Sequence, residues 1–141
     1  MKTLWAPWRA EYIRCAISQH STGRRGCLFC GLLKAKDDRQ NLILHRGRHA
    51  FVVMNRFPYN NGHLMIAPFR HVGSFTELTK EERGDLMDAV AHAERILSRA
   101  FSPQGMNVGA NMGHCAGAGV PGHVHVHIVP RWEGDTNFMH V

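Results

Sequence analysis

The stretch His-Val-His-Val-His-Ile-Val-Pro-Arg at residues 123–131 decides how this chain folds. Three histidines alternate with branched apolar residues, and a β-strand places every second side chain on one face. We therefore expect the imidazoles of His123, His125 and His127 to share one face of a strand. The other face then carries Val124, Val126 and Ile128. Three titratable rings on one face sacrifice apolar burial unless a phosphate or a metal uses them. The stretch therefore predicts a functional strand rather than an edge strand that happens to be rich in histidine.

Length and composition indicate one domain. The chain has 141 residues, of which 44% are hydrophobic, enough for one core but not for two. Residues 1–26 read as an irregular N-terminal extension, and residues 27–141 as the domain. No apolar run approaches the length of a membrane span, and the first residues lack the apolar stretch of a signal peptide. These features predict a cytoplasmic protein without a membrane partner.

The charge balance favours an anionic ligand. The formal net charge is +6, and eleven histidines can add to it. Such a chain suits nucleic acid or a small phosphorylated molecule. The basic residues are scattered, without a dense block or interleaved aromatics, which argues against a dedicated nucleic-acid binder. A small phosphorylated substrate fits better.

Hydrophobic periodicity predicts an α+β domain. Thr79 and Glu82 form a capping-box signature, and apolar residues at helical spacing follow as far as Phe101. Turn residues separate short apolar runs elsewhere. The predicted strands are 41–46, 49–55, 63–68, 106–111 and 123–130, with one main helix over 79–101. This order favours a five-stranded antiparallel meander sheet with one helix.

Four cysteines are too few for a disulfide scaffold at this length. Only Cys27 and Cys30 have an informative spacing, Cys-x-x-Cys. This spacing is typical of a redox pair or of half a zinc site. A thioredoxin-type redox motif follows a strand, and no strand is predicted before Cys27. A zinc site needs two further ligands, and its alternatives are free thiols or redox sensing.

Two motifs together resemble the histidine triad (HIT) superfamily of nucleotide hydrolases and transferases. They are the alternating run at 123–131, and Asn-Arg-Phe-Pro at 55–58 followed by Gly-His-Leu-Met-Ile-Ala-Pro at 62–68. The resemblance extends over about residues 27–135. The ends, Leu-Trp-Ala-Pro-Trp-Arg at 4–9 and Pro-Arg-Trp-Glu-Gly-Asp-Thr-Asn-Phe at 130–138, resemble the bacterial diadenosine-tetraphosphate phosphorylase-like branch.

The resemblance implies a role for each histidine. His125 matches the nucleophile, and a neutral imidazole is both a nucleophile and a tolerable leaving group at phosphorus. Its attack on an α-phosphate would give a nucleotidyl-histidine, which water or phosphate resolves. His127 would donate to a phosphate oxygen, with a structural hydrogen bond to a loop carbonyl as the alternative. His63 would orient the triad by hydrogen bonding, or act only structurally.

The same resemblance implies nucleotide and metal ligands. Asn55 would contact the ribose, Asn111 the ribose or phosphate, and the Gly-rich loop would offer backbone N–H groups through Gly117 and Gly119. The polar pair that many HIT proteins carry before the triad is replaced here by Ala-Gly-Val-Pro-Gly at 118–122. In zinc-bearing members, histidines matching His71 and His123 join the cysteine pair, so the expected structural zinc set is Cys27, Cys30, His71 and His123. His45 or His49 could replace His71.

The expected function follows from the family. It is cleavage of a dinucleoside polyphosphate such as diadenosine tetraphosphate through nucleotidyl-His125, with phosphorylase and hydrolase both open. The resemblance also implies a homodimer whose two sheets join. One alternative is a nucleoside phosphoramidate hydrolase, which shares the first chemical step. The other is a zinc-stabilised nucleotide-binding module without significant turnover.

Overall fold

The computed structural model describes Ala10 and residues 26–135. Helix α2 spans Leu28–Lys34 and helix α3 spans Lys80–Phe101. The strands are β1 (Ile43–Arg46), β2 (Ala50–Met54), β3 (Leu64–Pro68), β4 (Gly105–Gly109) and β5 (Val126–Arg131). Two short 3-10 helices, η2 (Phe75–Glu77) and η3 (His114–Ala116), lie in loops. Most of the predicted N-terminal extension lies outside the described residues. The motif at 4–9 and the last part of the motif at 130–138, residues 136–138, also lie outside them.

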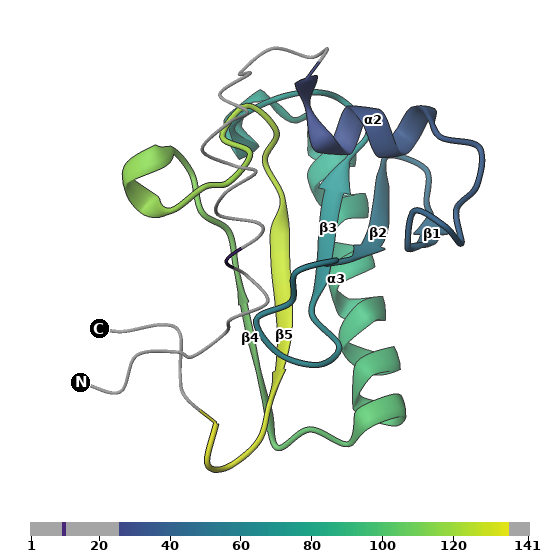
Figure 1. The fold of residues 1–141 in the computed structure, drawn as a ribbon. Coiled ribbons are helices and arrows are strands. Elements are labelled where there is room, and N and C mark those ends of the chain that lie inside the picture. The colour runs from purple at the N-terminus through teal and green to yellow at the C-terminus, as the bar shows by residue number, and fades with distance from the viewer. Residues whose placement is uncertain (1–9, 11–25, 136–141) are drawn as a thin grey trace.

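The strands form one antiparallel sheet in the order β1-β2-β3-β5-β4. The prediction of a five-stranded antiparallel sheet is confirmed, but the meander is wrong, because β5 lies between β3 and β4 (Figure 1). Burial explains why β5, and not β4, lies next to β3. Most side chains of β5 are buried, whereas β4 begins and ends in glycine and is largely exposed. The apolar strand therefore takes the inner position and the glycine-bounded strand takes the edge.

Strand β5 begins at Val126, three residues later than predicted. Its partner β3 pairs Ile66 with Val126, so the same register would bring Pro68 opposite Val124. Proline has no N–H to donate to the ladder. The Val124 N–H instead donates to the Val72 carbonyl at 2.7 Å. His123 and His125 thus precede the strand on a segment that is held by other bonds.

Helix α3 covers one face of the sheet (Figure 1). The predicted capping box is confirmed, since Thr79 accepts from the Glu82 N–H and Glu82 accepts from the Thr79 N–H. The buried stripe of the helix is Leu86, Val90, Ala93 and Leu97. These side chains form one cluster with Val124, Val126 and Ile128. The three apolar residues of the alternating run therefore share one face, as expected, and the structure shows that this face packs against α3.

Helix α2 packs on the other face, and periodicity did not predict it. It has only seven residues, contains Gly31 and has no side-chain cap, so tertiary packing must stabilise it. Its buried Phe29 and Cys30 form a second cluster with Phe51, Met65 and others. None of the helices in the described part of the chain is long and apolar enough to cross a membrane.

Candidate active site

The histidine side chains lie on the face of the sheet opposite α3. His127 belongs to β5 and pairs with Met65, a member of the second cluster. The rings of His125 and His127 have centroids 4.8 Å apart. Phe29 of α2 contacts the rings of His123 and His125, with centroids at 5.1 Å and 4.7 Å. The alternation thus separates an imidazole face from an apolar face.

His125 has a defined tautomer. Its Nδ1 lies 2.9 Å from the backbone carbonyl of His123. A carbonyl oxygen only accepts hydrogen bonds, so Nδ1 carries the proton and Nε2 keeps its lone pair. The residue is only 4% exposed, and this burial lowers the pKa of His125 below its ordinary value. A neutral imidazole with a free Nε2 lone pair is the form that can attack phosphorus.

His63 and His127 are joined directly. His63 Nε2 lies 2.9 Å from His127 Nδ1, and His63 is 1% exposed. Asn55 also contacts this pair, because its amide nitrogen lies 3.3 Å from His63 Nδ1. The predicted contact between His63 and the triad is therefore present, and Asn55 is brought to the same group. Its role toward a ribose stays a prediction.

The Gly-rich loop is brought together only in part. Asn111 Nδ2 donates to the Gly117 carbonyl at 3.5 Å. Gly117 ends η3 in the left-handed region with φ +83°, which glycine adopts without strain. Gly119 is exposed two residues further on. Asn111 and Gly117 thus share one corner of the loop, and a phosphate contact by any of the three stays a prediction.

The four expected metal ligands converge. One donor atom from each of Cys27, Cys30, His71 and His123 lies within 4.8 Å of every other. The Sγ–Nδ1 distances are 3.3 Å for Cys27–His123, 3.4 Å for Cys30–His71 and 3.7 Å for Cys30–His123. Around a tetrahedral zinc, sulfur and nitrogen ligands lie about 3.5 Å apart. The spacing of the donors therefore fits that ion.

The surroundings of His123 suit a ligand. Its Nε2 lies 2.8 Å from the Pro68 carbonyl, so Nε2 carries the proton and the Nδ1 lone pair faces the cysteines. Burial lowers the pKa of His123 to about 4, which keeps the ring neutral. Burial also raises the pKa of the Cys27 thiol, and a bound cation would reverse that by favouring the thiolate.

The alternatives to His71 are wrong for the described chain. His49 Nδ1 pairs with the Asp85 carboxylate, and the ring of His45 lies near His92 on α3. Neither contributes to the cysteine cluster. His45 on β1 and His49 in the β1–β2 turn both lie on the face of the sheet that α3 covers.

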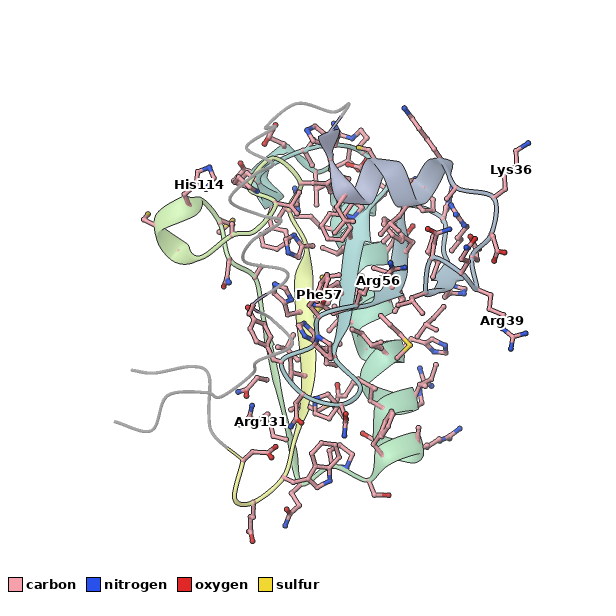
Figure 2. All side chains as sticks on the ribbon, in the orientation of Figure 1. Lys36, Arg39, Arg56, Phe57, His114 and Arg131 are labelled. Carbon is pink, nitrogen blue, oxygen red and sulfur yellow. The ribbon has the colours of Figure 1, made fainter. Side chains whose placement is uncertain are left out.

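Basic side chains project from opposite sides of the molecule. Figure 2 shows Lys36 and Arg39 projecting from the loop after α2, while His114 projects from η3 at the other side of the molecule.

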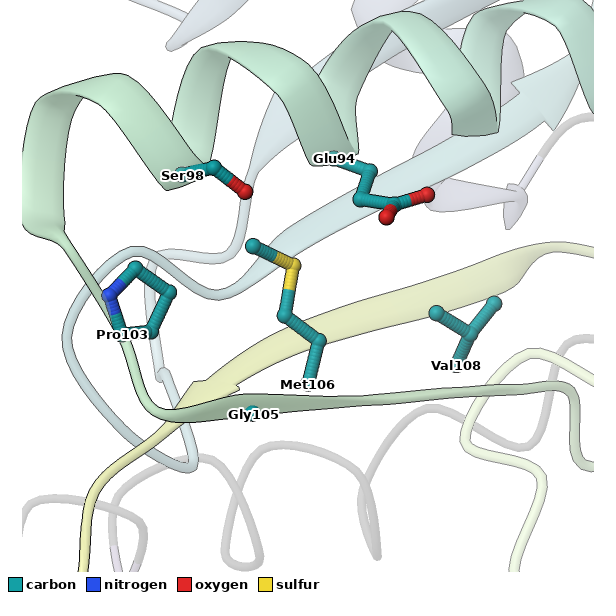
Figure 3. Close-up of a pocket in the computed structure, with 6 residues that line it drawn as sticks. All are labelled: Glu94, Ser98, Pro103, Gly105, Met106 and Val108. Atoms are coloured by element: carbon teal, nitrogen blue, oxygen red, sulfur yellow. The ribbon is translucent and has the colours of Figure 1, made fainter.

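A pocket between α3 and β4 is lined by Glu94, Ser98 and Met106, among others (Figure 3). Met106 packs against the α3 cluster, so this pocket opens on the face away from the imidazoles.

Comparison with known proteins decides the family. The HIT domain family matches residues 36–134. The chain belongs to the HIT family. A protein of Mycobacterium tuberculosis named AP-4-A phosphorylase is 37% identical over 142 residues, which cover 99% of this chain and 72% of that protein.

Two further similar proteins differ in the extent of the match. The asymmetrical bis(5'-nucleosyl)-tetraphosphatase of Schizosaccharomyces pombe is 34% identical over 66% of this chain and 50% of its own length. A crystal structure of a HIT family member from Bacillus subtilis has a TM-score of 0.72 and 27% identity, covering 82% of this chain and 79% of that one. The sheet and its helix are therefore the HIT fold.

Two site residues of this HIT domain were missed by sequence reasoning. Phe29 contacts the rings of His123 and His125, and its signal was its position inside Cys-x-x-Cys, which ties it to the metal ligands. Tyr59 stacks on His63 with centroids 4.9 Å apart. The sequence feature that could have identified Tyr59 is its position four residues before His63, in the turn that connects β2 to β3.

Proposed function

We propose that this protein cleaves dinucleoside polyphosphates of the diadenosine tetraphosphate type through a covalent nucleotidyl-His125 intermediate. The observation that carries the proposal is the Nδ1–H bond from His125 to the His123 carbonyl, which leaves Nε2 as the nucleophilic atom. The names of the two relatives, a phosphorylase and a tetraphosphatase of such substrates, support the substrate class.

The proposed chemistry has two displacements. His125 Nε2 forms a bond to the α-phosphorus while the bond from that phosphorus to the bridging oxygen breaks, and ATP leaves from diadenosine tetraphosphate. The imidazole then carries a positive charge, and its Nδ1–H stays on the His123 carbonyl, which stabilises that charge. Inorganic phosphate or water next attacks phosphorus, and the N–P bond breaks to restore neutral His125. His127 is proposed to donate to a phosphoryl oxygen during both steps.

Product analysis tests this proposal. The protein is incubated with diadenosine tetraphosphate, with and without inorganic phosphate, and the nucleotides are separated. ADP plus ATP only with phosphate identifies a phosphorylase, and AMP plus ATP identifies a hydrolase. His125→Ala should abolish either reaction, whereas His92→Ala, at an exposed position on α3, should not change it. Unchanged turnover in His125→Ala would refute the covalent mechanism.

We further propose that the cysteine and histidine cluster holds a structural zinc ion. Two thiolates and two imidazoles form the closed set that zinc prefers. When bound, the ion would cross-link the start of α2, the loop after β3 and the segment before β5. Through His123 it would fix the carbonyl that orients His125. Elemental analysis of protein purified without chelator should find one zinc per chain, and Cys30→Ser should lose it.

A homodimer is part of the proposal. Within the described chain β4 is an edge strand, and Val108 on it is 46% exposed beside the pocket of Figure 3. A second copy that paired along β4 would satisfy its backbone groups and cover this side chain. Sedimentation of the full chain should show a dimer, and Val108→Lys should shift it toward monomer. A cytoplasmic location stays a prediction.

A further inference from the structure

Tyr59 holds His63 by two separate contacts. Its backbone N–H donates to His63 Nδ1 at 3.0 Å. Its ring lies nearly parallel to the imidazole, with an interplanar angle of 16° and centroids 4.9 Å apart. His63 is 1% exposed, so water has little access to the imidazole. The N–H determines which nitrogen accepts a hydrogen bond, and the stacked ring determines the plane of the imidazole.

Asn55 supplies a second donor to the same nitrogen. Its Oδ1 accepts from the Phe57 N–H at 2.9 Å, so the group that faces His63 Nδ1 at 3.3 Å is the amide NH₂. Two donors therefore converge on Nδ1 of His63. This nitrogen must keep its lone pair, and the proton of the neutral ring must sit on Nε2.

The tautomer of His63 is passed to His127. His63 Nε2 lies 2.9 Å from His127 Nδ1, and because Nε2 carries the proton, His127 Nδ1 is the acceptor. A neutral His127 must then carry its own proton on Nε2. Its ring is nearly perpendicular to that of His125, at 75° and 4.8 Å between centroids. An N–H donor is thus maintained beside the nucleophile, where a phosphoryl oxygen would gain negative charge.

We propose that Tyr59 is a positioning residue that fixes the proton of His127 on Nε2, acting through His63 with the help of Asn55. The consequence for turnover rests on the proposed function. If the proton moved to Nδ1 of His127, a lone pair would face the phosphate oxygens in place of a donor. Tyr59 therefore affects the chemical step rather than substrate affinity.

Three variants test this inference. Tyr59→Phe keeps both the ring and the backbone N–H and serves as the matched control. Tyr59→Leu removes the stacked ring, while Asn55→Asp leaves Tyr59 intact and places a carboxylate acceptor against His63 Nδ1. Two-bond ¹H–¹⁵N correlation spectra of protein labelled with ¹⁵N-histidine report which ring nitrogen of His63 and His127 is protonated, and circular dichroism verifies folding. Steady-state kinetics with diadenosine tetraphosphate separate kcat from KM.

The wild type and Tyr59→Phe should both show His63 and His127 protonated on Nε2, because both proteins keep the stacked ring and the backbone N–H. Tyr59→Leu keeps the backbone N–H but removes the ring that holds the plane of the imidazole against it, so the ring shifts of His63 should become averaged. Asn55→Asp should move a proton onto Nδ1 of His63. Each should lower kcat by about 10- to 100-fold with KM little changed, as loss of the groups that orient a catalytic side chain does at other sites. An Asn55 that served only the ribose would instead raise KM and leave the tautomers alone.

A wild-type His63 protonated on Nδ1 would overturn the inference. So would unchanged tautomers in both Tyr59→Leu and Asn55→Asp. The spectra are recorded without substrate, so they decide the positioning role whether or not the protein turns over diadenosine tetraphosphate. Absence of turnover in the wild type, with both rings protonated on Nε2, would refute the proposed function and leave the positioning of His127 supported.

Discussion

The ion pair between Glu82 and Arg70 connects the start of α3 to the loop that carries His71. Arg70 Nε and Nη2 each lie 2.7 Å from an oxygen of the Glu82 carboxylate. The same carboxylate accepts from the Thr79 N–H at 2.8 Å. The bonds from Arg70, and after them the bond from Thr79, lower the pKa of Glu82 from an ordinary 4.5 to about 2. We expect Glu82→Gln, which keeps the size but removes the charge, to destabilise the fold.

The magnitude follows from the linkage between pKa and stability. A fall in pKa from 4.5 to about 2 corresponds to about 3 kcal/mol at full strength. The Arg70 side chain is 50% exposed, so solvent screening reduces this, and we expect about 1–2 kcal/mol at pH 7. A depressed folded-state pKa stabilises the protein above the unfolded value of 4.5. The contribution is then lost as the pH falls toward 2.

Urea unfolding at a series of pH values from 7 to 3 measures the difference between wild type and Glu82→Gln. That difference should be constant down to about pH 5 and shrink steadily below it. Glu94→Gln makes the same charge change on an exposed part of α3, away from Arg70, and should show little difference at any pH. A Glu82→Gln protein as stable as wild type at pH 7, or a difference that does not shrink in acid, would refute the reasoning.

Three further outcomes are expected. Phe29→Ala should cost about 3–5 kcal/mol in urea unfolding because Phe29 is fully buried, whereas the exposed neighbour Leu28→Ala should cost much less; equal losses would contradict the packing. Gly62→Ala should destabilise by about 2–4 kcal/mol, since φ is +78° and a Cβ would lie 3.1 Å from Pro130 and 3.2 Å from Phe101. A Cβ at Gly84 meets no atom within 4 Å, so Gly84→Ala should stabilise by about 0.5–1 kcal/mol. A melting temperature lower for Gly84→Ala than for Gly62→Ala would contradict this reasoning. Prolonged treatment with a zinc chelator should lower the melting temperature of the wild type but not of Cys30→Ser, and equal shifts would argue against the proposed ion.

Local sequence patterns were sufficient to predict the five strands and helix α3. The period of two at 123–131 separated imidazoles from apolar side chains, and the capping box placed the start of α3 within one residue. Both signals depend only on backbone geometry and near neighbours. The sheet order could not be read in this way, because strand position depends on which side chains most need burial from both faces. The same holds for α2, whose seven residues are stabilised by Phe29 and Cys30 packing rather than by helix propensity.

The sequence by itself determined the family, the alternating histidine run and the residue types able to hold a metal. Only the tertiary structure decided which partners surround each of the three histidines. Burial against Phe29 and the bond to the His123 carbonyl set His125 apart, convergence with two thiols sets His123 apart, and contact with His63 sets His127 apart. The physical reason is that the tautomer and basicity of an imidazole depend on the hydrogen-bond partners and desolvation supplied by distant segments. A one-dimensional pattern can align three identical rings, but it cannot distinguish them.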